Sequence, residues 1–223
     1  MDNKRMRVTT VSQKYIMALA GIFLMLFLVV HLGINLLMIV GDDGELFGEA
    51  VQFMITNPLI KIMEYVLFGG FLIHILLGVI LEIYNYRARP VKYAKSLKTE
   101  KSLFSKYMIH TGVIIFIFLI IHFMNFFFVK IGLVSVPEYA DSAYDFFPMA
   151  VVLFQDPVYS VIYLIALVFL GFHLKHAFQS AFQSLGLNHE KYTPAIKVIG
   201  TIYAIVISVG FAIIPIYFYF FYS

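Results

Sequence analysis

Five long stretches of this chain contain few charged residues, and no other feature of the sequence limits the fold as strongly. The first stretch runs from Tyr15 to Val40 without a single charge. A helix needs roughly 20 apolar residues to cross a bilayer core of about 30 Å. The sequence therefore predicts an all-α integral membrane protein with five transmembrane helices, at residues 15–40, 58–86, 105–131, 157–186 and 195–222.

The composition supports this class, because 61% hydrophobic and 13% charged residues leave too little polar surface for a soluble domain. No polar stretch exceeds about 30 residues, which is too short for a second core. We therefore expect one membrane domain over residues 1–223, without a separate catalytic domain. The absence of cysteine excludes disulfides and cysteine-ligated iron–sulfur clusters.

The loop charges predict the orientation in the membrane, because cytoplasmic loops carry an excess of Lys and Arg. Basic residues precede the first helix and follow the second and fourth, whereas the loops after the first and third helices are acidic. We expect a cytoplasmic N-terminus and an external C-terminus. The basic N-terminal stretch resembles that of a signal peptide, but the apolar run is too long for one and should be retained as a helix.

Helices one and two share landmarks with helices three and four. In each outward helix a glycine precedes a histidine by ten residues: Gly21 with His31, and Gly112 with His122. In each return helix a cap residue and a proline precede a histidine: Asn57-Pro58 with His74, and Asp156-Pro157 with His173. The matched spacings predict a parallel duplication with the fifth helix outside it.

The four histidines fall at two depths. With a rise of about 1.5 Å per residue, His31 and His122 lie in the outer half of the membrane. His74 and His173 lie about 10 Å deeper, on the other two helices.

Two facing imidazoles in a four-helix core match the axial positions of a haem iron. We predict two b haems, with His31 and His122 on the outer iron and His74 and His173 on the inner one. The other ring nitrogen should bond to a carbonyl or hydroxyl one turn away. Small residues that would admit the flat macrocycle are Gly21, Gly78, Gly112 and Ala177.

Alternatives remain for several of these residues. His176 lies three residues after His173 and could replace it as the ligand. A single intramembrane histidine is more often an interhelical hydrogen-bonding residue than a ligand. His110 and His189 are expected at the inner surface, as interfacial or solvated residues.

Polar residues at the two ends suggest further contacts. The candidates for haem propionates, or alternatively for interfacial anchors, are Ser12, Lys14, Lys106, Tyr107, Gln179 and Gln183. Glu45 and Glu49 in the outer loop could handle protons for a quinone, although a solvated acidic loop is the commoner explanation. Two bis-histidine haems without a substrate domain would make the chain an electron conduit between a donor and an acceptor.

The chain also resembles a known family over nearly its whole length. The motifs are the four ordered histidines, the opening SQKYIMALAGIFL, RARPVKY at 87–93 and GFHLKHAFQSAFQSLG at 171–186. They are similar to the dihaem cytochrome b subunit, of the b558 type, of succinate:quinone oxidoreductases (succinate dehydrogenase or fumarate reductase). The resemblance implies the ligand pairing given above, and its fourth-ligand motif fits His173 and Ala177 rather than His176.

The resemblance further implies a respiratory complex II of the bacterial cytoplasmic membrane. A flavoprotein subunit with FAD and an iron–sulfur subunit would dock on the cytoplasmic face, and a quinone, with menaquinone favoured, would react near the outer face. Some relatives carry a glutamate two residues before the fourth histidine. That position is Gly171 here, so coupling of electron transfer to the membrane potential is favoured over a compensating proton path.

Three rival functions remain at this point. The nearest is a dihaem subunit serving a hydrogenase, a formate dehydrogenase or ascorbate reduction. The second is a transporter or proton channel with a histidine relay, although such folds often use inverted repeats. The third is a haem-free anchor, which would leave the paired histidines unexplained.

Overall fold

The computed structural model describes residues 2–40, 43–87 and 108–222, and within these residues the chain is helical without any strand. Five helices are long and apolar enough to cross a membrane, with candidate spans at Val11–Leu36, Pro58–Tyr84, Met108–Lys130, Pro157–Ser184 and Thr193–Phe220. The prediction of an all-α membrane protein with five spans is confirmed. Large apolar side chains such as Leu26, Val168 and Ile205 are exposed along these helices, as lipid contact requires.

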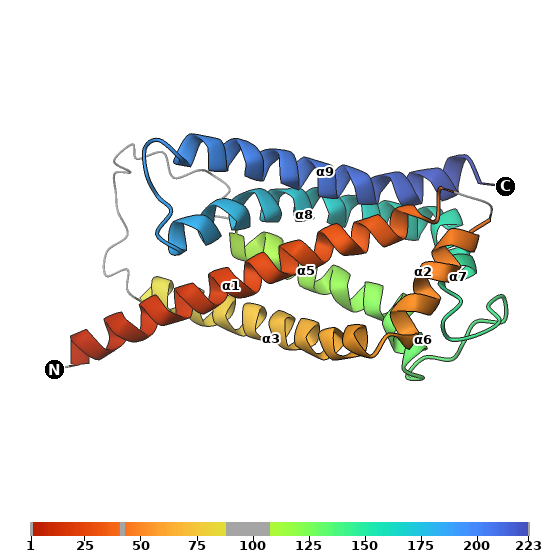
Figure 1. Cartoon of the computed structure of the whole chain (residues 1–223), viewed down its shortest axis with the longest axis horizontal. Coiled ribbons are helices and arrows are strands. Elements are labelled where there is room, and N and C mark those ends of the chain that lie inside the picture. The colour runs from red at the N-terminus through yellow and green to blue at the C-terminus, as the bar shows by residue number, and fades with distance from the viewer. Residues whose placement is uncertain (1, 41–42, 88–107, 223) are drawn as a thin grey trace.

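The four helices of the predicted bundle are α1 (Asp2–Leu36), α3 (Pro58–Arg87), α5 (Met108–His122) and α8 (Pro157–Ser184). Helix α1 packs against α3 and α8, and α5 packs mainly against α8 (Figure 1). In their described residues, no Cα atom of α1 lies within 8 Å of α5, and none of α3 lies within 8 Å of α8. These two pairs are therefore the diagonals of the bundle, and only side chains reach across them.

Helix α9 (Thr193–Phe220) lies outside this bundle and packs against α8 and α1. The Tyr203 hydroxyl donates a hydrogen bond of 2.6 Å to the Met25 carbonyl oxygen and ties α9 to α1. Pro215 is buried within α9, where neighbouring helices cover the backbone that a proline leaves unpaired. The termini lie at opposite ends of the molecule, as an odd number of spans requires (Figure 1).

The first helix differs from its predicted bounds of 15–40. It begins at Asp2 and ends at Leu36, and residues 37–40 form turns. These turns carry Met38 back into a cluster with Phe47 and Val51, where it is only 6% exposed. Burial of this apolar side chain against the outer end of the bundle explains why the helix ends before the uncharged stretch does.

Two outer segments that we expected to be loops contain helices. Helix α2 (Glu45–Thr56) and helix α7 (Phe146–Gln155) lie at the end of the molecule that holds the C-terminus (Figure 1). Each turns apolar residues inward, with Phe47 and Val51 from α2 and Met149 and Phe154 from α7. The outer Glu45 and Glu49 therefore lie on a helix and not in a loop.

Both return helices begin with the predicted caps. The Asn57 side-chain oxygen accepts hydrogen bonds from the backbone N–H groups of Leu59 and Ile60, at 2.9 and 3.4 Å. The Asp156 carboxylate accepts from Val158 and Tyr159 in the same way, at 2.7 and 3.4 Å. Both helices also follow a short helix, which adds a landmark to the predicted repeat.

Candidate functional site

The outer pair of histidines meets across one diagonal of the bundle. The rings of His31 on α1 and His122 on α5 have centroids 5.9 Å apart and planes at 83°. Phe27 stacks on His31 at 5.1 Å, and Phe118 stacks on His122 at 6.0 Å. The pair therefore lies in an aromatic, water-poor environment.

The inner pair meets across the other diagonal. The rings of His74 on α3 and His173 on α8 have centroids 6.3 Å apart and planes at 68°. Gly21 lies beside His74, and His31 follows Gly21 by ten residues of helix, so the two levels are about 15 Å apart along α1. This separation exceeds the 10 Å that the sequence suggested.

The spacing of both pairs fits a metal ion held between two imidazoles. With metal–nitrogen bonds of about 2.0–2.1 Å on opposite sides of the ion, the ring centroids would be roughly 6.3 Å apart. The observed 5.9 and 6.3 Å lie close to this value. The ring planes can differ because each imidazole is free to rotate about its own metal–nitrogen bond.

Two glycines keep open the space beside the inner pair. A Cβ atom added to Gly21 would lie 3.8 Å from His74 Cε1, and one added to Gly112 would lie 3.7 Å from His173 Cε1. Both glycines are on the helices that do not supply the inner histidines. Any side chain larger than alanine would extend toward the imidazoles, so these positions form a cradle next to the inner histidine pair.

The predicted small residues on α3 and α8, Gly78 and Ala177, differ from this pattern. A Cβ at Gly78 would meet the Met17 side chain at 3.5 Å, so α1 covers that position. Ala177 is half-buried, one turn beyond His173. His176 is half-buried as well, but it lies about 60° round the helix from His173, whose ring is the one that meets His74.

Two of the four rings have side-chain partners at Nδ1. The Asn35 amide donates to the His31 carbonyl oxygen at 2.7 Å and lies 3.3 Å from His31 Nδ1. The Thr111 hydroxyl lies 3.2 Å from His173 Nδ1. We expected a carbonyl or hydroxyl one turn away as the partner of each ring. This prediction was wrong in detail, because His31 has an amide partner and the partner of His173, Thr111, belongs to another helix.

The other two rings have a buried Nδ1 atom, in His74 and His122, that finds no hydrogen-bond partner among the described residues. A buried polar atom without a partner carries a desolvation cost and calls for an explanation. The ring spacing and the glycine cradle fit the predicted haem sites.

Helix α5 changes its geometry directly after His122. Residues Phe123–Phe127 form a π-helical turn, η1, before α6 (Phe128–Lys130). Within this turn the Asn125 amide donates to the Tyr163 hydroxyl at 3.1 Å. Such turns occur often at functional sites, and here the turn places an interhelical polar contact beside His122. The amide in an apolar run was the only sequence signal for it.

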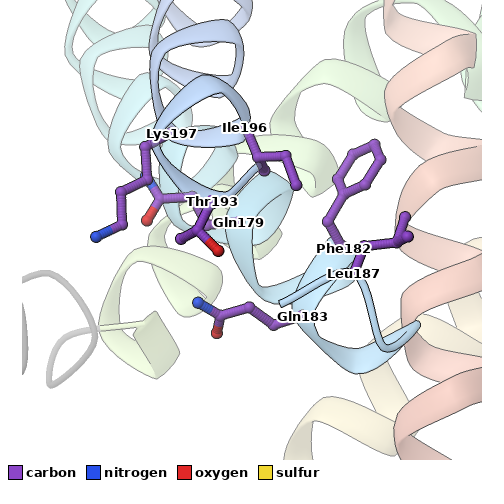
Figure 2. Close-up of a pocket in the computed structure, with 7 residues that line it drawn as sticks. All are labelled: Gln179, Phe182, Gln183, Leu187, Thr193, Ile196 and Lys197. Carbon is purple, nitrogen blue, oxygen red and sulfur yellow. The ribbon is translucent and has the colours of Figure 1, made fainter. Parts of the chain in front are cut away.

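The described candidates for propionate contacts lie near the N-terminal part of α1 and the C-terminal part of α8, at the end expected to be cytoplasmic. Ser12 and Lys14 are exposed on α1, whereas Lys106 and Tyr107 lie outside the described residues. Gln179 and Gln183 line a small pocket between α8 and α9, about 190 Å³ with its open space (Figure 2). The remaining lining residues are Phe182, Leu187, Thr193, Ile196 and Lys197.

The two glutamines lie about 80–120° round α8 from His173, toward α9. Their role with a propionate stays a prediction. The interfacial positions expected for His110 and His189 are consistent with the structure, in which both side chains are exposed.

A pocket at the outer end contains one of the two predicted quinone residues. Its volume is about 470 Å³ including open space, and Glu45 is part of its lining together with Asp43, Tyr144 and Phe147. Glu49 is exposed one turn further along α2. Tyr222 donates a hydrogen bond of 3.3 Å to Asp43, so the C-terminal end of α9 also contacts this region.

Gly171 packs against α9. A Cβ atom at this position would lie 2.9 Å from the Ser208 hydroxyl oxygen and 4.0 Å from the Ala204 carbonyl oxygen. A larger side chain at this position would require the Ser208 hydroxyl to rotate away or α9 to shift. Gly171 thus permits a close contact between α8 and α9.

An ion pair that we did not predict joins α3 to the end of the third span. Lys130 Nζ lies 2.6 Å from Glu64 Oε2, and the side chains are 24% and 31% exposed. Lys130 also lies over the Phe127 ring at 5.7 Å. Both charged residues were visible in the sequence, but their contact spans 66 residues and depends on how α3 and α6 pack.

The fold and the site define a multi-pass, all-α membrane protein with two pairs of facing histidines. No protein family, curated protein or solved structure matches the chain in comparisons.

Proposed function

We propose that the chain is the membrane subunit of a succinate:quinone oxidoreductase and that it holds two b haems. The observation that carries the proposal is that His31–His122 and His74–His173 meet at 5.9 and 6.3 Å across the two diagonals of one bundle. Haem held by two histidines supplies reversible one-electron chemistry and leaves no axial position for oxygen.

The protein's own residues would supply binding and orientation. The four imidazoles would act as axial ligands, and the Gly21 and Gly112 cradle would leave space beside the inner pair. The rings of Phe27, Phe118 and Phe126 pack around the outer pair and exclude water. The levels, about 15 Å apart along α1, would serve as steps between the two membrane faces.

The ends of the bundle would meet the donor and the acceptor. A flavoprotein subunit with FAD and an iron–sulfur subunit would dock on the basic, cytoplasmic end, in the cytoplasmic membrane of a bacterium. A quinone, with menaquinone favoured, would react near the outer pair. The pocket that Glu45 and Asp43 line at the outer end supports this placement.

The proposal is tested by the haem content per chain, from a pyridine haemochrome assay and a dithionite-reduced minus oxidised spectrum. Succinate then replaces dithionite in membranes that contain the whole complex. We expect two b haems per chain and reduction of at least one by succinate. A chain without haem would overturn the ligand assignments, and two haems that succinate leaves oxidised would contradict the succinate-linked partner.

A further inference from the structure

We propose that Thr111 is a positioning residue that fixes the proton of His173 on Nδ1 and thereby lowers the reduction potential of the inner haem. This inference rests on the proposed function, because it needs a metal centre at the inner pair. It concerns a residue that carried no signal in the sequence.

The hydrogen bonds of Thr111 determine the direction of its contact with His173. The hydroxyl donates its single proton to the Met108 carbonyl oxygen at 2.9 Å. While it donates to Met108, it can act toward His173 Nδ1, 3.2 Å away, only as an acceptor. The ring then donates at Nδ1, which leaves the lone pair of the neutral imidazole on Nε2, the nitrogen that is free to bind a metal ion.

The internal repeat provides a comparison within the same molecule. Gly112 lies beside His173 as Gly21 lies beside His74, at 3.7 and 3.8 Å from a Cβ position to Cε1. The residue before Gly112 is Thr111, whereas the residue before Gly21 is Ala20. The His74 Nδ1 atom is buried without a hydrogen-bond partner among the described residues, as expected where a methyl group replaces the hydroxyl.

The two histidines of the inner pair therefore differ in donor strength. A hydrogen bond from Nδ1–H makes the imidazole more basic and a stronger metal ligand. A stronger donor stabilises the ferric state more than the ferrous state, so it lowers the reduction potential. The repeat thus contains one ligand that Thr111 supports and one that lacks this support.

The experiment is a potentiometric titration of the full chain with its haems bound, in which visible absorbance reports the redox state of each haem. Thr111→Val keeps the shape of the side chain and removes the acceptor. We expect the midpoint of one haem to rise, with about a tenfold change in its ferric-to-ferrous ratio, which is about 59 mV for one electron. The other haem should titrate as in the unmodified chain.

Three further variants make the result specific. Thr111→Ser restores the hydroxyl and should restore the midpoint. Ala20→Thr adds a hydroxyl beside His74 and should move the same haem in the opposite direction. Thr201→Val is the matched control, because the Thr201 hydroxyl donates to the carbonyl oxygen of Lys197 on its own helix at 2.8 Å.

Unchanged midpoints in Thr111→Val, with both haems bound, would overturn the positioning role while the proposed function stands. If Thr111→Val loses haem, the inference is tested by Ala20→Thr instead. An unchanged midpoint potential of the inner haem in Ala20→Thr would then overturn the inference. An unmodified chain that binds no haem would instead overturn the proposed function itself.

Discussion

The imidazole rings of His31 and His122 lie 5.9 Å apart, although no described Cα atom of α1 comes within 8 Å of α5. Their side chains cross the middle of the bundle from opposite corners. The same relationship links His74 with His173 on the other diagonal. Diagonal helices in a four-helix bundle are the ones that leave a central space, so the arrangement puts each pair where a planar group can be enclosed.

Loss of one ligand should remove one haem and leave the other. We expect His122→Ala to lose the outer haem and His173→Ala to lose the inner one, each with about half of the reduced-minus-oxidised absorbance remaining. His176→Ala is the matched control for His173→Ala and should keep both haems. If His176→Ala lost a haem and His173→Ala kept both, His176 would be the ligand in place of His173.

Side chains at the glycine cradle should act on the inner haem alone. We expect Gly21→Val and Gly112→Val to block binding at the inner pair, because the added atoms extend toward His74 Cε1 and His173 Cε1. Gly33→Val is the control on α1, since a Cβ there meets no atom within 4 Å in the described structure. The measurement is haem content per chain with the retained spectrum. Full haem content in both cradle variants would contradict this function of the glycines.

The close contact at Gly171 predicts an overpacking penalty. Gly171→Ala should destabilise the chain by about 1–3 kcal/mol, because its Cβ would lie 2.9 Å from the Ser208 hydroxyl. Thermal unfolding in detergent, monitored by circular dichroism, measures the change in stability. Adding Ser208→Ala removes the opposing oxygen and should recover most of the loss. Equal stability of Gly171→Ala and the unmodified chain would show that α9 yields at this point.

The ion pair of Glu64 and Lys130 should stabilise the outer end of the bundle. Glu64→Gln and Lys130→Met should each lower the stability by about 0.6–1.7 kcal/mol, as measured for interhelical polar contacts in membranes. The exchanged double variant, Glu64→Lys with Lys130→Glu, should regain part of the loss because the pair can form again. A double variant that is less stable than Glu64→Gln and Lys130→Met would argue against a direct pair.

Several features of the site could be predicted from single helices. The caps at Asn57 and Asp156 follow from local hydrogen bonds, and the sorting of the histidines into two levels follows from the constant rise of a helix, although the levels are about 15 Å apart along α1 and not 10 Å. The inner placement of Gly21 and Gly112 follows from the same rise. These predictions needed no knowledge of how the helices pack.

Other features could not be predicted because they depend on rotation of one helix against another. Thr111 and His173 are 62 residues apart in sequence, and nothing in either segment specifies their contact. The same holds for Glu64 with Lys130 and for Gly171 with Ser208. In a membrane, lipid-facing and helix-facing surfaces are both apolar, so hydrophobic periodicity does not indicate which side of a helix turns inward.

The sequence by itself determined the class of protein, the five spans and the residues able to bind metal ions, because length, hydropathy and residue chemistry are local properties. The tertiary structure decided which helices form the diagonals, that α2 and α7 cover the outer end, and which side chains support the histidines. Those outcomes depend on packing between segments far apart in the chain. A polar group such as the Thr111 hydroxyl acquires its role only from the neighbour that packing brings to it.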